Sequence, residues 1–162
     1  MAAFSCSAPA LAKVSMDLIL WRHADAEDGV PDDARQLTAK GRKQAKKMAA
    51  WLAARLPAGY RVVVSPALRA RETAAALTEH VHIDKAVSTA ATPHEVLKAA
   101  GWPHGADTVV VVGHQPTLGA VAALVLTGEE TAWSVKKGAI WWIARDADDG
   151  VQVRAVLTPA IL

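Results

Sequence analysis

The chain of 162 residues contains a single cysteine, Cys6, and has neither a long apolar run nor a strong net charge. One cysteine cannot form an internal disulfide, so a disulfide framework is excluded and a reducing compartment such as the cytoplasm is expected. No apolar stretch approaches the roughly 20 residues of a membrane-spanning helix, so we expect no membrane association. The net charge of +2 is too small to predict nucleic-acid binding, and no feature indicates an obligate oligomer, so a monomer is expected.

Two nucleotide-binding signatures are also missing. The chain has no Gly-x-x-x-x-Gly-Lys loop, and no Gly-x-Gly-x-x-Gly follows the first predicted strand, which disfavours a nucleotide-binding protein. Disorder is excluded as well, because 52% of the residues are hydrophobic and only 21% are charged. The length suits one domain with a proper core.

Residues 1–15 are rich in alanine and serine and do not begin with the basic segment of a secretory signal. Met16 stands immediately before the first predicted strand and is a candidate start of the folded part. We therefore predict an N-terminal tail over residues 1–15 and a single domain over residues 16–162.

Short apolar runs alternate with helical patterns along the domain. Strands are predicted over residues 17–21, 61–64, 81–87 and 108–112, followed by a hairpin of 138–144 and 151–157. Helices are predicted over residues 38–56, 66–80, 92–100 and 116–126. Unbroken β-branched runs are typical of parallel sheets, so we predict an α/β three-layer sandwich with a mostly parallel central sheet flanked by helices. Trp141 and Trp142 adjoin on one strand, so one should face inward and the other outward.

Three predicted strands end in residues suited to a phosphate site. The first is followed by Arg22 and His23, the second by Ser65 and then Arg69, and the fourth by His114. Ligands of such sheets bind outside the carboxyl ends of the strands, so two histidines and two arginines should meet at one edge.

These side chains have complementary chemistry. Neutral imidazole is a good nucleophile near pH 7, and arginine offers a permanently charged planar fork for phosphate oxygens. Arg22 and Arg69 are therefore candidate phosphoryl ligands, and nearby cations should keep His23 unprotonated. His114, just before a predicted helix N-terminus, is a candidate donor to the same phosphoryl group.

Four blocks of sequence resemble the histidine phosphatase superfamily, also called the phosphoglycerate mutase-like fold. Arg22-His23-Ala24 resembles its Arg-His-Gly signature. The other blocks are RQLTAKG at 35–41, SPALRARET at 65–73 and VGHQP at 112–116. Together with the short length, their order and spacing resemble the SixA family of phosphohistidine phosphatases over residues 16–159. Each block alone is weak evidence, whereas four in order are strong.

The resemblance implies a role for each matching residue. His23 would be the nucleophile that becomes transiently phosphorylated, Arg22 and Arg69 would bind the phosphoryl oxygens, and His114 would be the second pocket histidine. The resemblance implies neither a metal nor another cofactor.

Two further residues are candidates for substrate binding, each with an alternative role. Arg35 either closes over the pocket or pairs with Asp32 or Asp33 on the surface. Ser65 either bonds phosphate or stabilises a turn.

The chain departs from its larger relatives after the third predicted strand. Those relatives place there a carboxylate that protonates the leaving group, whereas residues 88–93 contain none and the first is Glu95. A serine or sugar alkoxide needs such an acid, but imidazole is a far less basic leaving group. We therefore predict hydrolysis of phosphohistidine on a partner protein, such as a histidine phosphotransfer domain or a phosphocarrier.

Other functions stay open. If Asp25 or Glu27 supplies an acid, a small-molecule or phosphoserine phosphomonoesterase is the alternative. A phosphate-recognition module without turnover is another, although binding alone would not need His23. The loop carboxylates around residues 25–33 match no metal-binding spacing, and the basic cluster of residues 42–47 is expected to be a solvated helix face.

Overall fold

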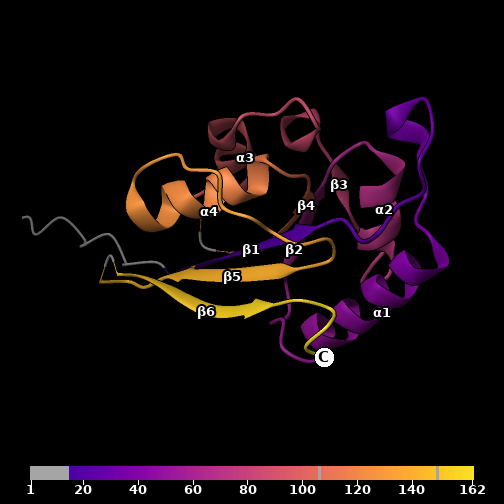
Figure 1. Cartoon of the computed structure of the whole chain (residues 1–162). Helices are drawn as coiled ribbons and strands as arrows, with labels where there is room; N and C mark the ends of the chain where they lie inside the picture. The colour runs from indigo at the N-terminus through magenta and orange to yellow at the C-terminus, as the bar shows by residue number, and fades with distance from the viewer. Residues whose placement is uncertain (1–14, 106, 149) are drawn as a thin grey trace, which may run out of the picture.

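The computed structural model describes residues 15–105, 107–148 and 150–162, so residues 1–14 of the predicted tail lie outside the described residues. A central sheet carries helices on both faces (Figure 1). Its strands are β1 (Met16–Arg22), β2 (Arg61–Val64), β3 (His82–Ile83), β4 (Thr108–Gly113), β5 (Ile140–Arg145) and β6 (Val151–Leu157). The α-helices are α1 (Ala39–Ala53), α2 (Leu68–Ala75), α3 (Pro93–Ala100) and α4 (Thr117–Thr127), and the short 3-10 helices are η1 (Asp32–Ala34) and η2 (Lys85–Val87). None of the described helices is long and apolar enough to cross a membrane.

The strands lie in the order β3-β2-β4-β1-β5-β6. The first four are parallel, whereas β5 runs antiparallel to β1 and β6 antiparallel to β5. The predicted α/β architecture with a mostly parallel sheet is confirmed. Because Arg22 pairs with Gly113 and Val64 pairs with Val112, β1, β2 and β4 end at the same edge. This edge carries the candidate site.

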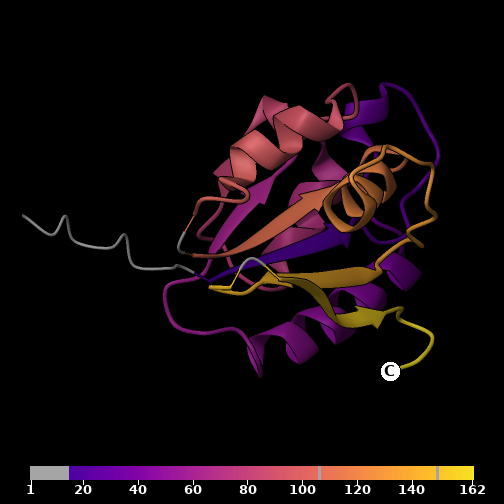
Figure 2. The same cartoon turned by 90° about the vertical axis from the view of Figure 1, so that its left-hand side faces the viewer.

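Apolar side chains fill both spaces between the sheet and the helices. Helices α3 and α4 cover one face, and α1 and α2 cover the other (Figure 2). On α1 the residues Ala45, Met48, Ala49 and Leu52 recur at helical spacing and are all buried. Thr38 caps this helix, because its side chain accepts a hydrogen bond from the Gly41 N–H.

Two predicted elements are shorter in the structure. The predicted strand 81–87 is reduced to β3, whose two residues are exposed and pair only with β2. Asp84 ends the pairing because its carboxylate accepts from the Ala86 N–H and starts η2. The predicted helix 66–80 is wrong at both ends, since α2 begins at Leu68, after Pro66, and ends at Ala75.

Candidate active site

His23 is the first residue beyond β1, and its backbone N–H donates to the carbonyl of Gly113 on β4 over 3.1 Å. Its side chain is buried, with Nδ1 2.8 Å from the carbonyl oxygen of Ala24. A carbonyl only accepts, so Nδ1 carries the proton and the lone pair lies on Nε2. The fold therefore presents Nε2 as the nucleophilic atom.

The surroundings keep this imidazole neutral. Burial, together with the positive charges of Arg69, Arg22 and Arg35, lowers the pKa of His23 to about 4, against the opposing effect of the hydrogen bond to Ala24. At neutral pH the ring is therefore uncharged and able to attack an electrophile, as the sequence predicts.

Two arginines lie beside His23. Arg22 ends β1 and is fixed by a 2.9 Å hydrogen bond from Nη1 to the carbonyl of Val135. Arg69 lies in the first turn of α2 with only 3% of its surface exposed. Burial and the charge of Arg69 lower the pKa of Arg22. In the described part of the chain, both Nε atoms are buried without a hydrogen-bond partner, so an incoming anion would supply charge and acceptors.

His114 faces His23 across the site, with 5.2 Å between the ring centroids. Its Nε2 lies 2.7 Å from the hydroxyl oxygen of Ser65, and its Nδ1 lies 3.5 Å from Nη2 of Arg69. Burial, together with the charges of His23 and Arg69, lowers the pKa of His114 to about 3. Ser65 also accepts from the Ala67 N–H over 3.2 Å, so it stabilises the turn before α2 while orienting His114.

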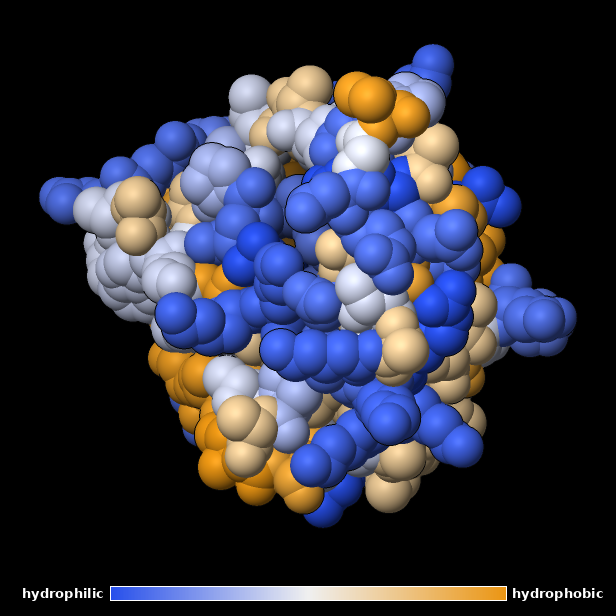
Figure 3. Space-filling view, turned by 45° about the vertical axis from the view of Figure 1, so that its right-hand side comes forward, coloured by the Kyte–Doolittle hydropathy of each residue, from blue (hydrophilic) through white to orange (hydrophobic). Residues whose placement is uncertain are grey.

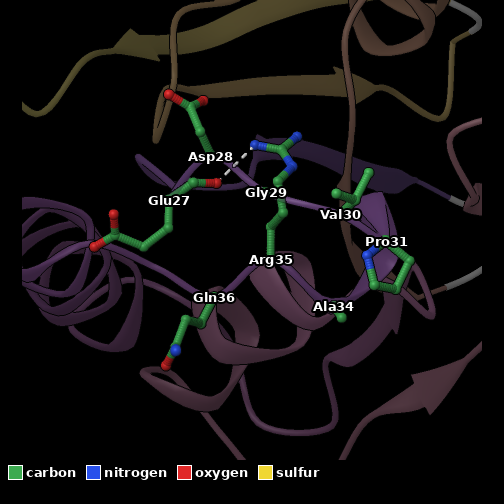
Figure 4. A pocket seen from close by; sticks show the side chains of 8 residues that line it. All are labelled: Glu27, Asp28, Gly29, Val30, Pro31, Ala34, Arg35 and Gln36. Carbon is green, nitrogen blue, oxygen red and sulfur yellow. Dashed lines mark hydrogen bonds between the residues drawn. The ribbon is translucent and has the colours of Figure 1, made fainter.

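The loop after β1 brings a carboxylate to Arg69. Asp32, in η1, accepts a 2.9 Å hydrogen bond from Arg69 Nη2 on its side chain and a 2.8 Å bond from Nη1 on its carbonyl. Arg35 pairs with the other carboxylate oxygen of Asp32 at 2.8 Å and donates to the carbonyl of Glu27 (Figure 4). Arg35 thus makes the ion pair with Asp32 that the sequence offers as one of its two roles, and its charge also acts on His23. The same loop encloses a hollow of about 160 Å³.

Two candidate acids, Asp25 and Glu95, are engaged in other contacts. Asp25 accepts from Lys137 at 2.8 Å and from the Thr38 hydroxyl at 2.9 Å, and these hydrogen bonds lower its pKa. Glu95 closes a capping box with Thr92 at the start of α3, and hydrogen bonds from the Thr92 backbone and side chain lower its pKa. Neither carboxyl is prepared to donate a proton near neutral pH.

Two further residues, Thr73 and Asp32, shape this site through contacts with Arg69 that no sequence motif assigns to them. Thr73 on α2 donates its hydroxyl to the Arg69 carbonyl at 2.7 Å and accepts from the Ala24 N–H at 3.0 Å, which joins α2 to the nucleophile's loop. Its position four residues after Arg69, on the same side of the helix, was the available signal. Asp32 contacts Arg69 across 37 residues of sequence, and no local pattern indicates that pairing.

No group of three or more histidine, cysteine or acidic side chains in the described ranges is arranged to hold a metal ion. Two of the loop carboxylates, Asp25 and Asp32, instead make the ion pairs given above. What the site offers is a neutral imidazole with a free lone pair, one buried and one half-buried guanidinium group, and a second imidazole.

Known proteins share this arrangement of sequence and fold. The model of the histidine phosphatase superfamily (branch 1) matches residues 18–92. An uncharacterised protein of Mycobacterium tuberculosis (strain ATCC 25618 / H37Rv) is 35% identical over 121 residues, which cover 68% of this chain and 74% of the relative. Phosphohistidine phosphatase SixA of Escherichia coli (strain K12) is 30% identical over 123 residues, which cover 70% of this chain and 76% of SixA.

Solved structures agree with the sequence relatives. The structure of the protein histidine phosphatase SixA complexed with tungstate superposes with a TM-score of 0.77 at 26% identity, covering 90% of this chain and 99% of that one. A phosphoserine phosphatase mutant of Entamoeba histolytica shares the fold, with a TM-score of 0.68 at 16% identity over 91% of this chain and 99% of that one. The chain belongs to the histidine phosphatase superfamily, and within it to the SixA-type phosphatases.

Proposed function

We propose that this phosphatase hydrolyses phosphohistidine on a partner protein in the cytoplasm through a phosphorylated His23. The observation that carries the proposal is that residues 87–92, next to the histidines and arginines of the site, bring no carboxylate to a leaving group, while Asp25 and Glu95 are held in other contacts. The similarity to SixA supports the same substrate class.

In the first step, His23 Nε2 attacks the phosphorus of the substrate phosphohistidine. The new N–P bond forms as the substrate N–P bond breaks, and the electron pair returns to the departing ring. If that ring is protonated on its other nitrogen beforehand, it leaves as neutral imidazole and needs no acid from the enzyme. Arg22 and Arg69 bind the phosphoryl oxygens and neutralise their charge during the transfer.

In the second step, water attacks the phosphorus of phosphorylated His23. The Ala24 carbonyl keeps the proton on Nδ1, so the phosphorylated ring is cationic and its N–P bond is weak. Breaking that bond returns the electron pair to Nε2, regenerates the neutral imidazole and releases phosphate with both protons of the water. His114 lies 5.2 Å from His23 between ring centroids, where it lines the same phosphoryl group.

The segment after β3 is where an acid would have to stand. Gly113 lies near the carbonyl of Val87, and Thr117 donates its hydroxyl to the carbonyl of Ala91, so residues 87–92 adjoin the pocket. The exposed Ala90 belongs to this segment and brings no proton donor. An alkoxide leaving group would therefore depart unassisted, and general acid catalysis is worth about 10²–10⁴ in rate.

The test uses two peptides of one sequence, carrying phosphohistidine or phosphoserine at the same position. Wild type should release phosphate from the phosphohistidine peptide at least about 100-fold faster than from the phosphoserine peptide. His23→Gln should release phosphate from neither peptide. When the peptide carries radiolabelled phosphate and the reaction is stopped without acid, gel electrophoresis should show labelled phosphate bound to wild type and none bound to His23→Gln. Comparable turnover of both peptides would instead support the phosphoserine alternative, and stable phosphate binding without turnover would support a recognition module.

A second variant examines the missing acid directly. Ala90→Glu should raise turnover of the phosphoserine peptide and leave the phosphohistidine rate nearly unchanged, because only the alkoxide needs a proton. Ala90→Gln is the matched control, with the same shape and no acidic proton. If both variants leave the ratio of the two rates unchanged, the proposed basis of substrate choice is wrong.

A further inference from the structure

Helix α1 carries an exposed row of lysines, Lys40, Lys43 and Lys47, which we call the basic strip. These three side chains line a surface hollow of about 390 Å³ together with Gln44 and Pro159. Figure 3 looks onto the side of the molecule that bears α1 and α2, and hydrophilic side chains cover much of its middle.

The basic strip does not stabilise its own helix. Lysines near a helix N-terminus meet the positive end of the macrodipole, and like charges three or four residues apart repel each other. Residues 39–53 contain no acidic side chain that would offset this repulsion. In the described part of the chain, no ion pair includes Lys40, Lys43 or Lys47. Lys47 donates a 3.3 Å hydrogen bond to the carbonyl of Pro159, which is uncharged, so the positive charges of all three lysines are available to an outside partner.

The basic strip begins beside the candidate active site. Asp25 lies two residues after His23. Its backbone carbonyl accepts a 3.0 Å hydrogen bond from the Thr38 N–H, and its backbone N–H donates to the side chain of Gln44 at 3.0 Å. Lys137 forms an ion pair with Asp25 at 2.8 Å, and the neighbouring Gly138 N–H donates to the His23 carbonyl at 3.0 Å, so this segment joins the start of α1 to the site. A protein whose phosphorylated side chain enters the pocket would lie against these lysines.

We propose that the basic strip docks an acidic protein segment next to the phosphohistidine that His23 attacks. This inference rests on the proposed function. Lys40 and Lys47 are seven residues apart, which is about 10 Å along a helix, so two or three carboxylates on a partner would match the row. Charge complementarity of this kind raises the association rate and selects among phosphorylated proteins.

The composition of this surface favours an acidic protein over nucleic acid or a membrane. Base stacking and membrane insertion use exposed aromatic or large apolar side chains. The exposed large apolar residues of the described chain lie elsewhere, in the loop after β1, in β3 and in the C-terminal hairpin and tail, and none lies on α1. The basic strip therefore offers charge alone.

The test compares two phosphohistidine peptides, one flanked by glutamates and one flanked by glutamines. Wild type should show a kcat/KM about tenfold higher for the glutamate peptide at low salt, and added salt should remove the advantage. Lys43→Glu/Lys47→Glu should lose this advantage and keep its rate on the glutamine peptide. The control Lys46→Glu/Lys98→Glu changes net charge equally outside the hollow and should retain the advantage.

The remaining outcomes distinguish failure of the docking proposal from failure of the proposed phosphohistidine hydrolysis. Equal rates on both peptides would overturn the docking role and leave phosphohistidine hydrolysis intact, whereas no cleavage of either peptide would overturn both. Loss of activity on both peptides in Lys43→Glu/Lys47→Glu, with circular dichroism unchanged, would make these lysines part of catalysis rather than docking. Tighter binding of a DNA duplex or of phosphatidylserine vesicles than of the glutamate peptide would also overturn the proposal.

Discussion

Acid should destabilise this protein in a pH range set by its two pocket histidines. Folding lowers the pKa of His23 to about 4 and of His114 to about 3, from an ordinary value of 6.5. Between pH 6.5 and these lowered values, the two histidines bind protons in the unfolded chain and remain unprotonated in the folded chain. The free energy of unfolding is therefore fully retained above pH 6.5 and declines as the pH falls toward 4.

The size of this effect follows from the interval between the unfolded and folded pKa values. Well inside that interval each histidine lowers the free energy of unfolding by about 1.4 kcal/mol for each unit by which the pH falls. Lowering the pH from 7.5 to 5 therefore costs about 2 kcal/mol of stability for each histidine. The two together cost about 4 kcal/mol, a large part of the 5–15 kcal/mol of a typical domain. Asp25 and Asp32 have lowered pKa values as well, so their contribution to stability is lost only below about pH 4.

Urea unfolding followed by circular dichroism at pH 7.5, 6.5, 5.5 and 5 measures the loss. The control is the double variant His23→Gln/His114→Gln, which has no imidazole in the pocket and should lose most of the pH dependence in this range. A loss below about 1 kcal/mol in wild type, or the same slope in the variant, would refute the reasoning. Folded wild type should also keep about nine-tenths of its His23 unprotonated at pH 5.

Three substitutions test other parts of the site and its support. Ser65→Ala removes the 2.7 Å contact with His114. Steady-state kinetics should show kcat lowered about fivefold with little change in KM, because the hydrogen bond that orients His114 contributes about 1 kcal/mol. An unchanged kcat would contradict this role of Ser65. Gly119→Ala places a Cβ against the Trp133 carbonyl and should cost about 1–3 kcal/mol in thermal unfolding. Glu95→Ala removes one half of the capping box of α3 and should lower the melting temperature slightly while leaving kcat unchanged, whereas a fall of about tenfold in kcat would identify Glu95 as the missing acid.

The parallel core of the sheet could be predicted because its signal is local. The run Val62–Val64 and the run Val109–Val112 are short, β-branched and buried on both faces, so their type and length follow from the residues themselves. Turn and cap residues such as Thr38 are equally local. The convergence of His23, Arg69 and His114 then follows from parallel strands ending at one edge.

Features that depend on distant partners could not be predicted. Trp141 and Trp142 were expected to face opposite environments, yet Trp141 packs against Trp133 at 5.7 Å and Trp142 against Trp51 at 6.1 Å between ring centroids. Both faces of β5 are covered, and alternation along one strand does not reveal what lies above and below it. The Asp32–Arg69 ion pair is hidden for the same reason, since it joins a loop to a helix that the sequence does not place side by side.

The position of β4 between β1 and β2 has a consequence for how the protein forms during synthesis. β1 and β2 leave the ribosome first, but neither touches the other in the finished sheet, because Leu18 and Val62 pair with Val109 and Val110 of the later strand. His23, Arg22 and Arg69 are thus translated well before the strand that unites them. We expect the nascent chain to remain without a closed pocket until residues 108–113 emerge, so ribosome-bound chains ending earlier should be sensitive to protease and unable to retain phosphate.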